Sequence, residues 1–228
     1  ELLKLNTLKS ETPVMFKDFV NGVDQEKKEI YYISAKMSLN MLKNSPTLER
    51  FKAKGIDVLI LNEEIDTIVF PMVQEYNEFK FINVVDAKLD ESEEEKEEQK
   101  QKTKELETFI GQMENALGES IKKVEATFDL TDSAVCLKID KEDPNYMMAQ
   151  MMKQFGNQGG MDIPPIKPIL QINPNHELIK KLSDSADAAL IDDAAHVLLD
   201  QAKLYDGESL EDTAGFISRL NRIIAKAL

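Results

Sequence analysis

The chain has 228 residues, of which 31% are charged and 42% hydrophobic, with only 9 glycines and 8 prolines. This composition excludes a collagen-like or wholly disordered chain and is typical of a folded protein with two domains of ordinary size. The formal net charge of −14 has the wrong sign for neutralising phosphates or coating an anionic membrane, so we expect no nucleic-acid partner and no membrane partner.

The cysteine count and the hydropathy pattern point to a reducing compartment. The single Cys136 cannot form an internal disulfide or a thiolate metal site, and no run of 18 apolar residues is present to span a bilayer. We therefore predict a cytoplasmic protein. Because the first residue is Glu1 rather than Met, we also expect an excised fragment of a longer chain.

Strand and helix patterns alternate in the first part of the chain. Glu29–Ser34 is rich in aromatic and β-branched residues, Ile56–Leu61 is a short apolar run, and 79–84 is again strand-like. Helical patterns over 45–55 and 65–76 lie between them, the second interrupted by a proline. This alternation predicts a small three-layer α/β/α subdomain.

The charge distribution shifts near Asp86. Beyond it, seven carboxylates fall within nine positions from Asp90 to Glu98. Such a run is a candidate site for a cation or a basic partner, but a solvated helix start that suits the helix dipole is favoured. We place the domain boundary here, giving domains over 1–86 and 87–228.

The second part reads as α+β. Segments 124–128 and 134–139 flank a polar turn and predict an antiparallel hairpin, and 168–172 predicts a third strand. We expect a mixed three-stranded sheet with helices that end in a dimerising helical bundle. The helical patterns cover residues 175–182, 186–205 and 210–228.

Motifs for catalysis or cofactor binding do not occur. The sequence has no dinucleotide-binding glycine pattern, P-loop or zinc-protease motif. His176 and His196 have no nucleophile near them in sequence, Cys136 is expected to be a small core residue, and the pair Asp192-Asp193 points in different directions around a helix. We predict no catalytic residue, no metal and no cofactor in this chain.

A methionine-rich segment from Tyr146 to Phe155 is the most unusual local feature. On a helix its large apolar side chains share one face. Core packing is one interpretation, and a tethered, partly exposed helix that binds peptides is the other, because methionine adapts to many partner shapes. The residues predicted for such binding are Tyr146, Met147, Met148, Met151, Met152 and Phe155.

The last two helices carry more apolar surface than one small sheet could cover. Two such helices from each of two chains would form an isologous four-helix interface. An intrachain bundle explains the pattern equally well. The candidate dimer-interface residues are Leu190, Ala194, Val197, Leu198, Phe216, Leu220, Ile223 and Ile224.

Several sequence blocks resemble one chaperone family. They are Lys28–Ile33, Ser45–Leu59, Glu64-Ile65-Asp66, Leu170–His176 and Leu198–Ala202, in the family's order. With these blocks the chain is similar, over essentially its whole length, to the C-terminal portion of the 90-kDa heat-shock protein chaperone family in its bacterial form.

The resemblance implies a chaperone that works as a homodimeric clamp. It implies that 1–86 is the end of the middle domain and 87–228 the C-terminal dimerisation domain. Non-native client proteins, and other chaperones, are the implied partners. ATP and Mg would then belong to a missing N-terminal domain, so that this fragment is no enzyme and holds no cofactor.

The resemblance also bears on which helices bind clients. In the family, the helix matching Tyr146 to Phe155 projects into the clamp, and the helix after Glu64-Ile65-Asp66 faces the same cleft, which makes Ile68 and Val69 further candidates. A purely structural dimerisation scaffold with a packed methionine helix is the alternative. The chain lacks the acidic tail of eukaryotic cytosolic members, so docking of helical-repeat co-chaperones is not expected.

Overall fold

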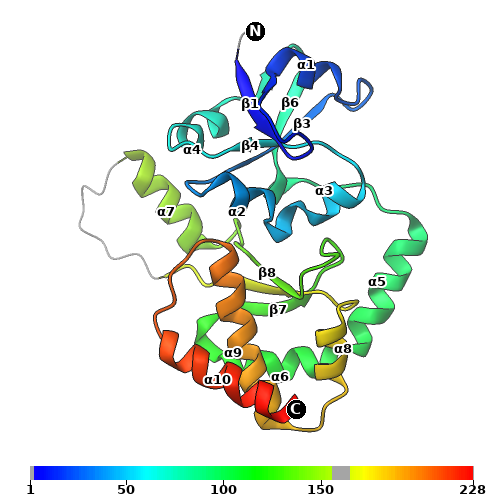
Figure 1. Cartoon of the computed structure of the whole chain (residues 1–228), viewed down its shortest axis with the longest axis vertical. Helices are drawn as coiled ribbons and strands as arrows, with labels where there is room; N and C mark the ends of the chain where they lie inside the picture. The colour runs from blue at the N-terminus through cyan, green and yellow to red at the C-terminus, as the bar shows by residue number, and fades with distance from the viewer. Residues whose placement is uncertain (1–2, 156–164, 228) are drawn as a thin grey trace. The chain divides into compact units, whose positions relative to one another are not determined.

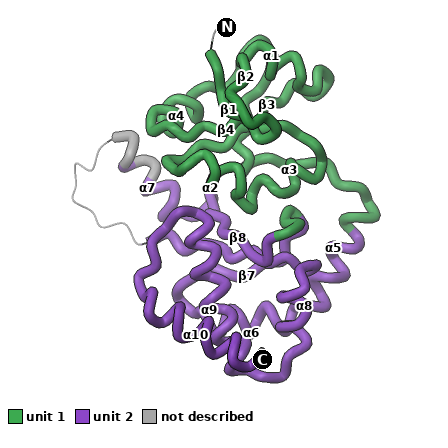
Figure 2. Tube along the Cα trace, viewed as in Figure 1, with its two compact units in different colours: residues 1–96, 129–132 green, residues 97–128, 133–228 purple. Residues whose placement is uncertain are grey.

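The chain divides into two compact units in a computed structural model that describes residues 3–155 and 165–227, excluding the side chains at 150, 151, 153–155 and 227. Unit 1 comprises residues 1–96 and 129–132, and unit 2 comprises 97–128 and 133–228 (Figure 2). The division therefore lies further along the chain than the predicted boundary after residue 86. The assignment of the two parts to a middle and a C-terminal domain stays a prediction.

Unit 1 is built on a six-stranded sheet in the order β2-β1-β4-β3-β6-β5 (Figure 1). The central strand β3 pairs in parallel with β4 and β6, while β1, β2 and β5 add antiparallel edges. The strands are β1 (Lys4–Thr7), β2 (Val14–Met15), β3 (Glu29–Ser34), β4 (Leu59–Leu61), β5 (Glu75–Tyr76) and β6 (Phe79–Asn83).

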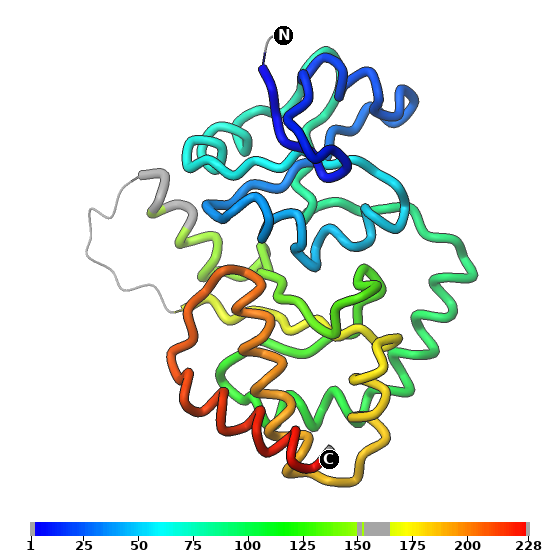
Figure 3. Tube along the Cα trace, viewed as in Figure 1, coloured from blue at the N-terminus to red at the C-terminus, as the bar shows by residue number. Residues whose placement is uncertain are grey.

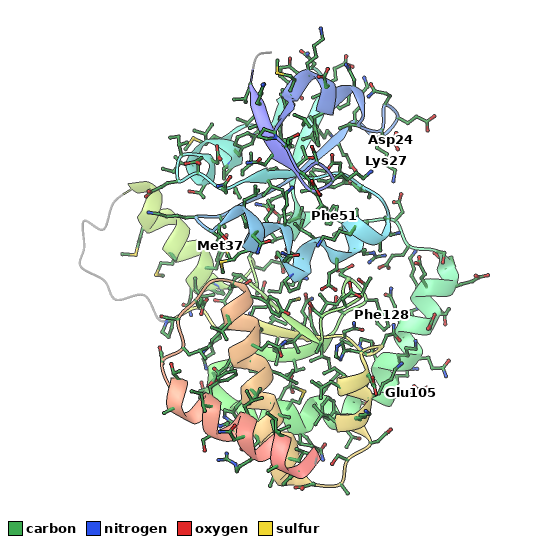
Figure 4. The ribbon with its side chains drawn as sticks, viewed as in Figure 1. Asp24, Lys27, Met37, Phe51, Glu105 and Phe128 are labelled. Atoms are coloured by element: carbon green, nitrogen blue, oxygen red, sulfur yellow. The ribbon has the colours of Figure 1, made fainter. Side chains whose placement is uncertain are left out.

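Helices cover both faces of this sheet, because side chains along β3 alternate between two hydrophobic clusters. Ile30 and Tyr32 pack with α1 (Phe16–Asn21), and Tyr31 and Ile33 pack with the other helices. Those helices are α2 (Leu39–Lys43), η1 (Pro46–Leu48) and α3 (Glu49–Ala53), and Phe51 of α3 lies 5.1 Å from the ring of Tyr31 (Figure 4). The three layers agree with the predicted α/β class.

The predicted helix over 65–76 is wrong in its second half. Helix α4 (Asp66–Val69) gives way to the 3₁₀ turn η2 (Phe70–Met72), and Glu75-Tyr76 forms β5. Pro71 has no amide hydrogen to continue the helix. Asn77 and Glu78 then take positive φ angles of 48° and 69°, which form the tight turn between β5 and β6.

Unit 2 contains a mixed three-stranded sheet in the order β7-β9-β8. Its strands are β7 (Lys123–Ala126), β8 (Val135–Lys138) and β9 (Ile169–Ile172), with β9 parallel to β7 and antiparallel to β8. The predicted β7–β8 hairpin is therefore wrong, although a mixed three-stranded sheet is present. The segment that connects β7 to β8 does not form a tight hairpin turn, since its residues 129–132 belong to unit 1.

One face of this sheet carries the core of unit 2. Val124, Val135, Leu170 and Ile172 pack against α6 and α9, and α10 lies along α9. The helices of unit 2 are α6 (Glu107–Leu117), α7 (Pro144–Phe155), α8 (Glu177–Ser183), α9 (Ala188–Tyr205) and α10 (Thr213–Ala227), with the 3₁₀ turn η4 (Gly118–Ser120) before β7. The 3₁₀ turn η3 (Val84–Asp86) belongs to unit 1, and helix α5 (Glu93–Glu105) crosses the division between the units.

The apolar surface of α9 is largely covered within the single chain. Ala194 and Leu198 are buried, at 4% and 1% exposed, in the cluster shared by α6, α9 and the sheet. This corrects the description of the C-terminal helices as a dimerising bundle, because intrachain packing already accounts for much of their hydrophobic pattern.

Two neighbouring side chains of α3 secure the segment 129–132 within unit 1. The buried carboxylate of Glu49 accepts hydrogen bonds from the backbone N–H groups of Thr131 (2.6 Å) and Asp132 (2.8 Å). The guanidinium of Arg50 bonds Glu91 at 2.8 Å and also pairs with Asp129. A buried acceptor that satisfies two amides is costly to remove, since both amides lose their partner.

Replacing Glu49 tests this arrangement. We expect Glu49→Ala to lower the free energy of unfolding by about 1–3 kcal/mol, because two amide groups lose their acceptor. Urea denaturation followed by circular dichroism measures the change. Glu64→Ala, which removes an exposed partner of Lys36, is the control and should alter stability by less than about 0.5 kcal/mol. Equal effects of the two substitutions would contradict the role of Glu49.

A second prediction concerns Asp206, the residue after α9. The pKa of its carboxyl is raised to about 6, chiefly because the group loses hydration and also because Glu208 lies near it. A raised pKa means that the folded chain disfavours the ionised carboxylate. Asp206 therefore lowers the free energy of unfolding fully above pH 6, and this penalty disappears as the pH falls to 3.8, the ordinary pKa of the group.

We therefore expect Asp206→Asn to raise the melting temperature at pH 7.5, with a gain that shrinks to nothing near pH 4. Thermal unfolding across this pH range measures the difference from the parent chain. Asp184→Asn, the same change at the end of α8, controls for the altered net charge. A gain from Asp206→Asn that stays constant between pH 4 and 7.5 would contradict the raised pKa.

Candidate functional site

Helix α7 presents methionines to solvent. Met147 and Met148 are 52% and 46% exposed, whereas Tyr146 and Met152 are half-buried. The predicted partners Met151 and Phe155 lie on the same helix, but their side chains are outside the described part of the structure. The described half of the predicted stripe is thus partly open, and none of its members belongs to the core cluster of unit 2.

A second apolar surface lies on α4 and η2 in unit 1. Ile68 and Val69, the residues predicted from sequence, are both exposed, and Ile65 and Met72 extend the surface, with Met72 76% exposed. Phe70 alone points inward, where its ring lies 5.7 Å from Tyr32 and 5.8 Å from Phe81. One anchoring ring therefore holds a short segment whose other large apolar residues face outward.

The predicted dimer-interface residues separate into two groups. Ala194 and Leu198 are buried within the chain, and Leu190 and Ile223 are partly buried against the same core. Val197, Phe216 and Leu220 are half-buried, and Ile224 is 47% exposed. Ile217, which lies seven residues before Ile224 and therefore on the same side of the helix, is also exposed. Helix α10 thus carries an outward apolar stripe, formed by Ile217 and Ile224, beside its inward one.

Ion pairs fix α10 against α9. The Arg222 guanidinium donates to both carboxylate oxygens of Asp193, with Nε 2.8 Å from Oδ2, and Lys226 Nζ lies 2.6 Å from Asp187 Oδ2. These contacts hold the pKa values of Asp193 and Asp187 below their ordinary range. The outward stripe of α10 is consequently presented on a helix with a defined rotation about its axis.

Unit 1 also contains a cavity of about 660 Å³ between the β1–β2 loop, α1 and the turn before β4. Asp24 and Lys27, which lie in the loop after α1 (Figure 4), are among the residues that line it. The Asp24 carboxylate accepts from the N–H groups of Glu26 and Lys27, which lowers its pKa, and Asp57 Oδ1 accepts from Lys9 N at 3.0 Å. Two of the carboxylates that line the cavity, those of Asp24 and Asp57, thus already accept hydrogen bonds from backbone N–H groups.

The lining of this cavity does not match a magnesium-bound triphosphate. Two lysines face four carboxylates, those of Asp18, Asp24, Glu29 and Asp57, so the local charge would repel phosphates. Lys27 moreover forms an ion pair with Asp90. In the described part of the chain, no three His, Cys, Asp or Glu side chains meet in a way that could hold a metal ion.

Sequence reasoning missed three of the exposed apolar residues. Ile65 and Met72 flank the predicted pair Ile68 and Val69, and Ile217 lies among the residues predicted for the interface. The helical spacing of 65, 68, 69 and 72 was the pattern that could have found the first two.

No helix among residues 3–155 and 165–227 is long and apolar enough to cross a membrane.

Comparison with known proteins gives a match along the whole chain. The family model described as Hsp90 protein matches residues 1–228. Proteins named chaperone protein HtpG are 61% identical in Sulfurimonas denitrificans, 40% in Wolinella succinogenes and 39% in a Sulfurovum species. Each alignment covers 100% of this chain but only 36%, 37% and 36% of those relatives, so the chain spans about a third of their length.

The comparisons correct two expectations of the sequence analysis, namely that residues 1–228 are no enzyme and that they hold no cofactor, with ATP and Mg in a missing domain. The Hsp90 model matches the chain from its first residue to its last, so both expectations are wrong. The lining of the cavity in unit 1 nevertheless does not fit the nucleotide. By its full-length match to the family model and its 61% identity to a named relative, the chain belongs to the Hsp90 family.

Proposed function

We propose that this chain dimerises and captures non-native client proteins as part of a cytoplasmic Hsp90-type chaperone. Units 1 and 2 are then the end of the middle domain and the C-terminal domain. The observation that carries the proposal is the outward position of large, flexible apolar side chains on α7, where Met147 and Met148 are exposed. Other chaperones are further candidate partners.

Client capture needs apolar surface that adapts to many sequences. Methionine supplies this because its unbranched side chain has several rotatable bonds and a polarisable sulfur. The surface of Ile65, Ile68, Val69 and Met72 on unit 1 offers a second place of the same chemistry.

Substitution of Met148 tests the α7 surface. We expect Met148→Asp to weaken suppression of client aggregation several-fold, because a carboxylate is costly to bury against an apolar client segment. Light scattering of a heat-denatured client, measured with and without the chain, gives the effect. Met41→Asp, at an exposed methionine on α2 outside both patches, is the matched control and should leave suppression unchanged.

A change in melting temperature with Met148→Asp would instead indicate that the helix packs permanently, as in the alternative of a purely structural dimerisation scaffold. Hydrogen exchange separates these two functions independently. Amides of α7 in a packed helix are protected to nearly the global stability, whereas those of an exposed tethered helix exchange by local opening. Protection of 145–149 equal to that of α9 would contradict client capture by α7.

Dimerisation is proposed to use the outward stripe of α10. Ile217 and Ile224 are 51% and 47% exposed, and Phe216 and Leu220 are half-buried beside them. A second copy that contributes the same helix would bury both stripes in an isologous interface. The buried Ala194 and Leu198 would then support the interface from within the chain without contacting the partner.

Ile224→Asp tests this surface. We expect the substitution to raise the dimer dissociation constant by at least about tenfold, because each interface of a twofold dimer would contain two carboxylates in an apolar contact. Multi-angle light scattering over a dilution series measures the mass. Val85→Asp, at an exposed residue of unit 1, is the control and should leave the mass at that of a dimer. A monomer at micromolar concentration without any substitution would refute the dimer.

A further inference from the structure

The described residues between β8 and β9, 139–155 and 165–168, form an excursion from the sheet of unit 2 whose two ends meet. The chain leaves β8, enters α7, and returns at the start of β9 (Figure 3). The last residue of β8, Lys138, pairs in register with the first residue of β9, Ile169. The described side chains of α7 lie outside the core cluster of unit 2, so their link to the sheet is through the segments that join α7 to β8 and β9.

Lys122, the residue before β7, contacts both ends of the excursion. Its ammonium bonds Asp140 Oδ2 at 2.7 Å and Asp143 Oδ2 at 3.0 Å on the outgoing side. Its backbone N–H donates to the carbonyl oxygen of Pro168, 2.8 Å away, on the returning side. Three residues earlier, Glu119 forms an ion pair with Lys167. The segment before β7 thus bonds to the excursion both where it leaves β8 and where it returns to β9.

The contact on the outgoing side reaches the first turn of α7. Asp143 precedes the helix, where its Oδ1 accepts from Asn145 N at 2.9 Å and its carbonyl accepts from Met147 N at 3.0 Å. Asp140 likewise uses Oδ1 to accept from Glu142 N at 2.9 Å. In both residues one carboxylate oxygen shapes the turn and the other binds Lys122. The ammonium therefore locks the direction in which α7 leaves the sheet.

The electrostatics agree with this geometry. Hydrogen bonds to Asp140 and Asp143 raise the pKa of Lys122, and the same bonds lower the pKa of each carboxyl. One ammonium between two carboxylates remains charged over the whole physiological range. A 12-residue helix is marginal in isolation, so α7 depends on its attachment for a fixed direction.

We propose that Lys122 is a positioning residue for client capture: by joining both ends of the excursion it holds α7 in the direction that presents Met147 and Met148. This rests on the proposed client-binding function of α7. A helix held in one direction binds with a smaller loss of conformational entropy than one that moves about its base. Lys122 itself does not contact the client.

The test compares Lys122→Met with two matched variants of the whole 228-residue chain. Lys122→Arg keeps a cation that can bridge two carboxylates. Lys123→Met removes the same charge one residue along, where the lysine pairs with Glu125 at 2.7 Å within β7. Amide exchange across 143–149 reports the attachment, and suppression of aggregation of a heat-denatured client reports capture. Circular dichroism confirms that each variant is folded.

We expect Lys122→Met to speed amide exchange in 143–149 and to weaken capture by about fivefold, the effect of losing two partly exposed ion pairs. Lys122→Arg should restore both readouts, and Lys123→Met should change neither. Unchanged exchange in Lys122→Met would overturn the proposal, and so would equal effects of Lys122→Met and Lys123→Met.

The proposal and the client-binding function on which it rests fail in different ways. Faster exchange in Lys122→Met with undiminished capture overturns the positioning role if Met148→Asp still impairs capture. If Met148→Asp also leaves capture unchanged, the client-binding function of α7 is refuted, and the positioning role is overturned with it.

Discussion

The placement of β9 between β7 and β8 determines how unit 2 uses its chain. Because β9 pairs with both neighbours, residues 139–168 must leave the end of β8 and return to the adjacent end of β9. The described side chains of α7 take no part in the hydrophobic cluster of unit 2. Helix α7 is therefore free to present its methionines, and the few polar contacts at its base acquire an importance that the same contacts would lack in a packed helix.

The packing of each helix likewise determines which of its apolar residues are buried. Helix α9 packs against α6 and the sheet, and its residues Leu198 and Ala202 are buried in that core. Helix α10 buries one stripe against α9 and leaves Ile217 and Ile224 outside. Helices α4 and α7 are short segments with little core to bury. Among the described residues, the exposed apolar side chains of α4, α7 and α10 therefore lie outside the hydrophobic clusters of their own units.

The periodicity and the turn residues of the sequence predicted strands β3, β4 and β6 and the long helices of unit 2, but not strands β1, β2 and β5. Apolar runs marked β3 and β4, and Gly55, with a φ of 64°, ended α3 as expected. The pairing of β7 with β9 could not be predicted, because a turn-like Thr131-Asp132 also suits a hairpin. The structure shows instead that the carboxylate of Glu49, 82 positions away along the chain from Thr131, holds that turn in unit 1, a contact that no local pattern indicates.

The candidate binding surfaces were also only partly predictable from the sequence. Helical spacing on α7 indicated an apolar face but could not tell whether a core would cover it, and for α9 the same kind of pattern proved to be core. Charge helps to explain how exposed methionines are tolerated. With a net charge of −14, copies of the chain repel one another at long range, which opposes association through the open patches.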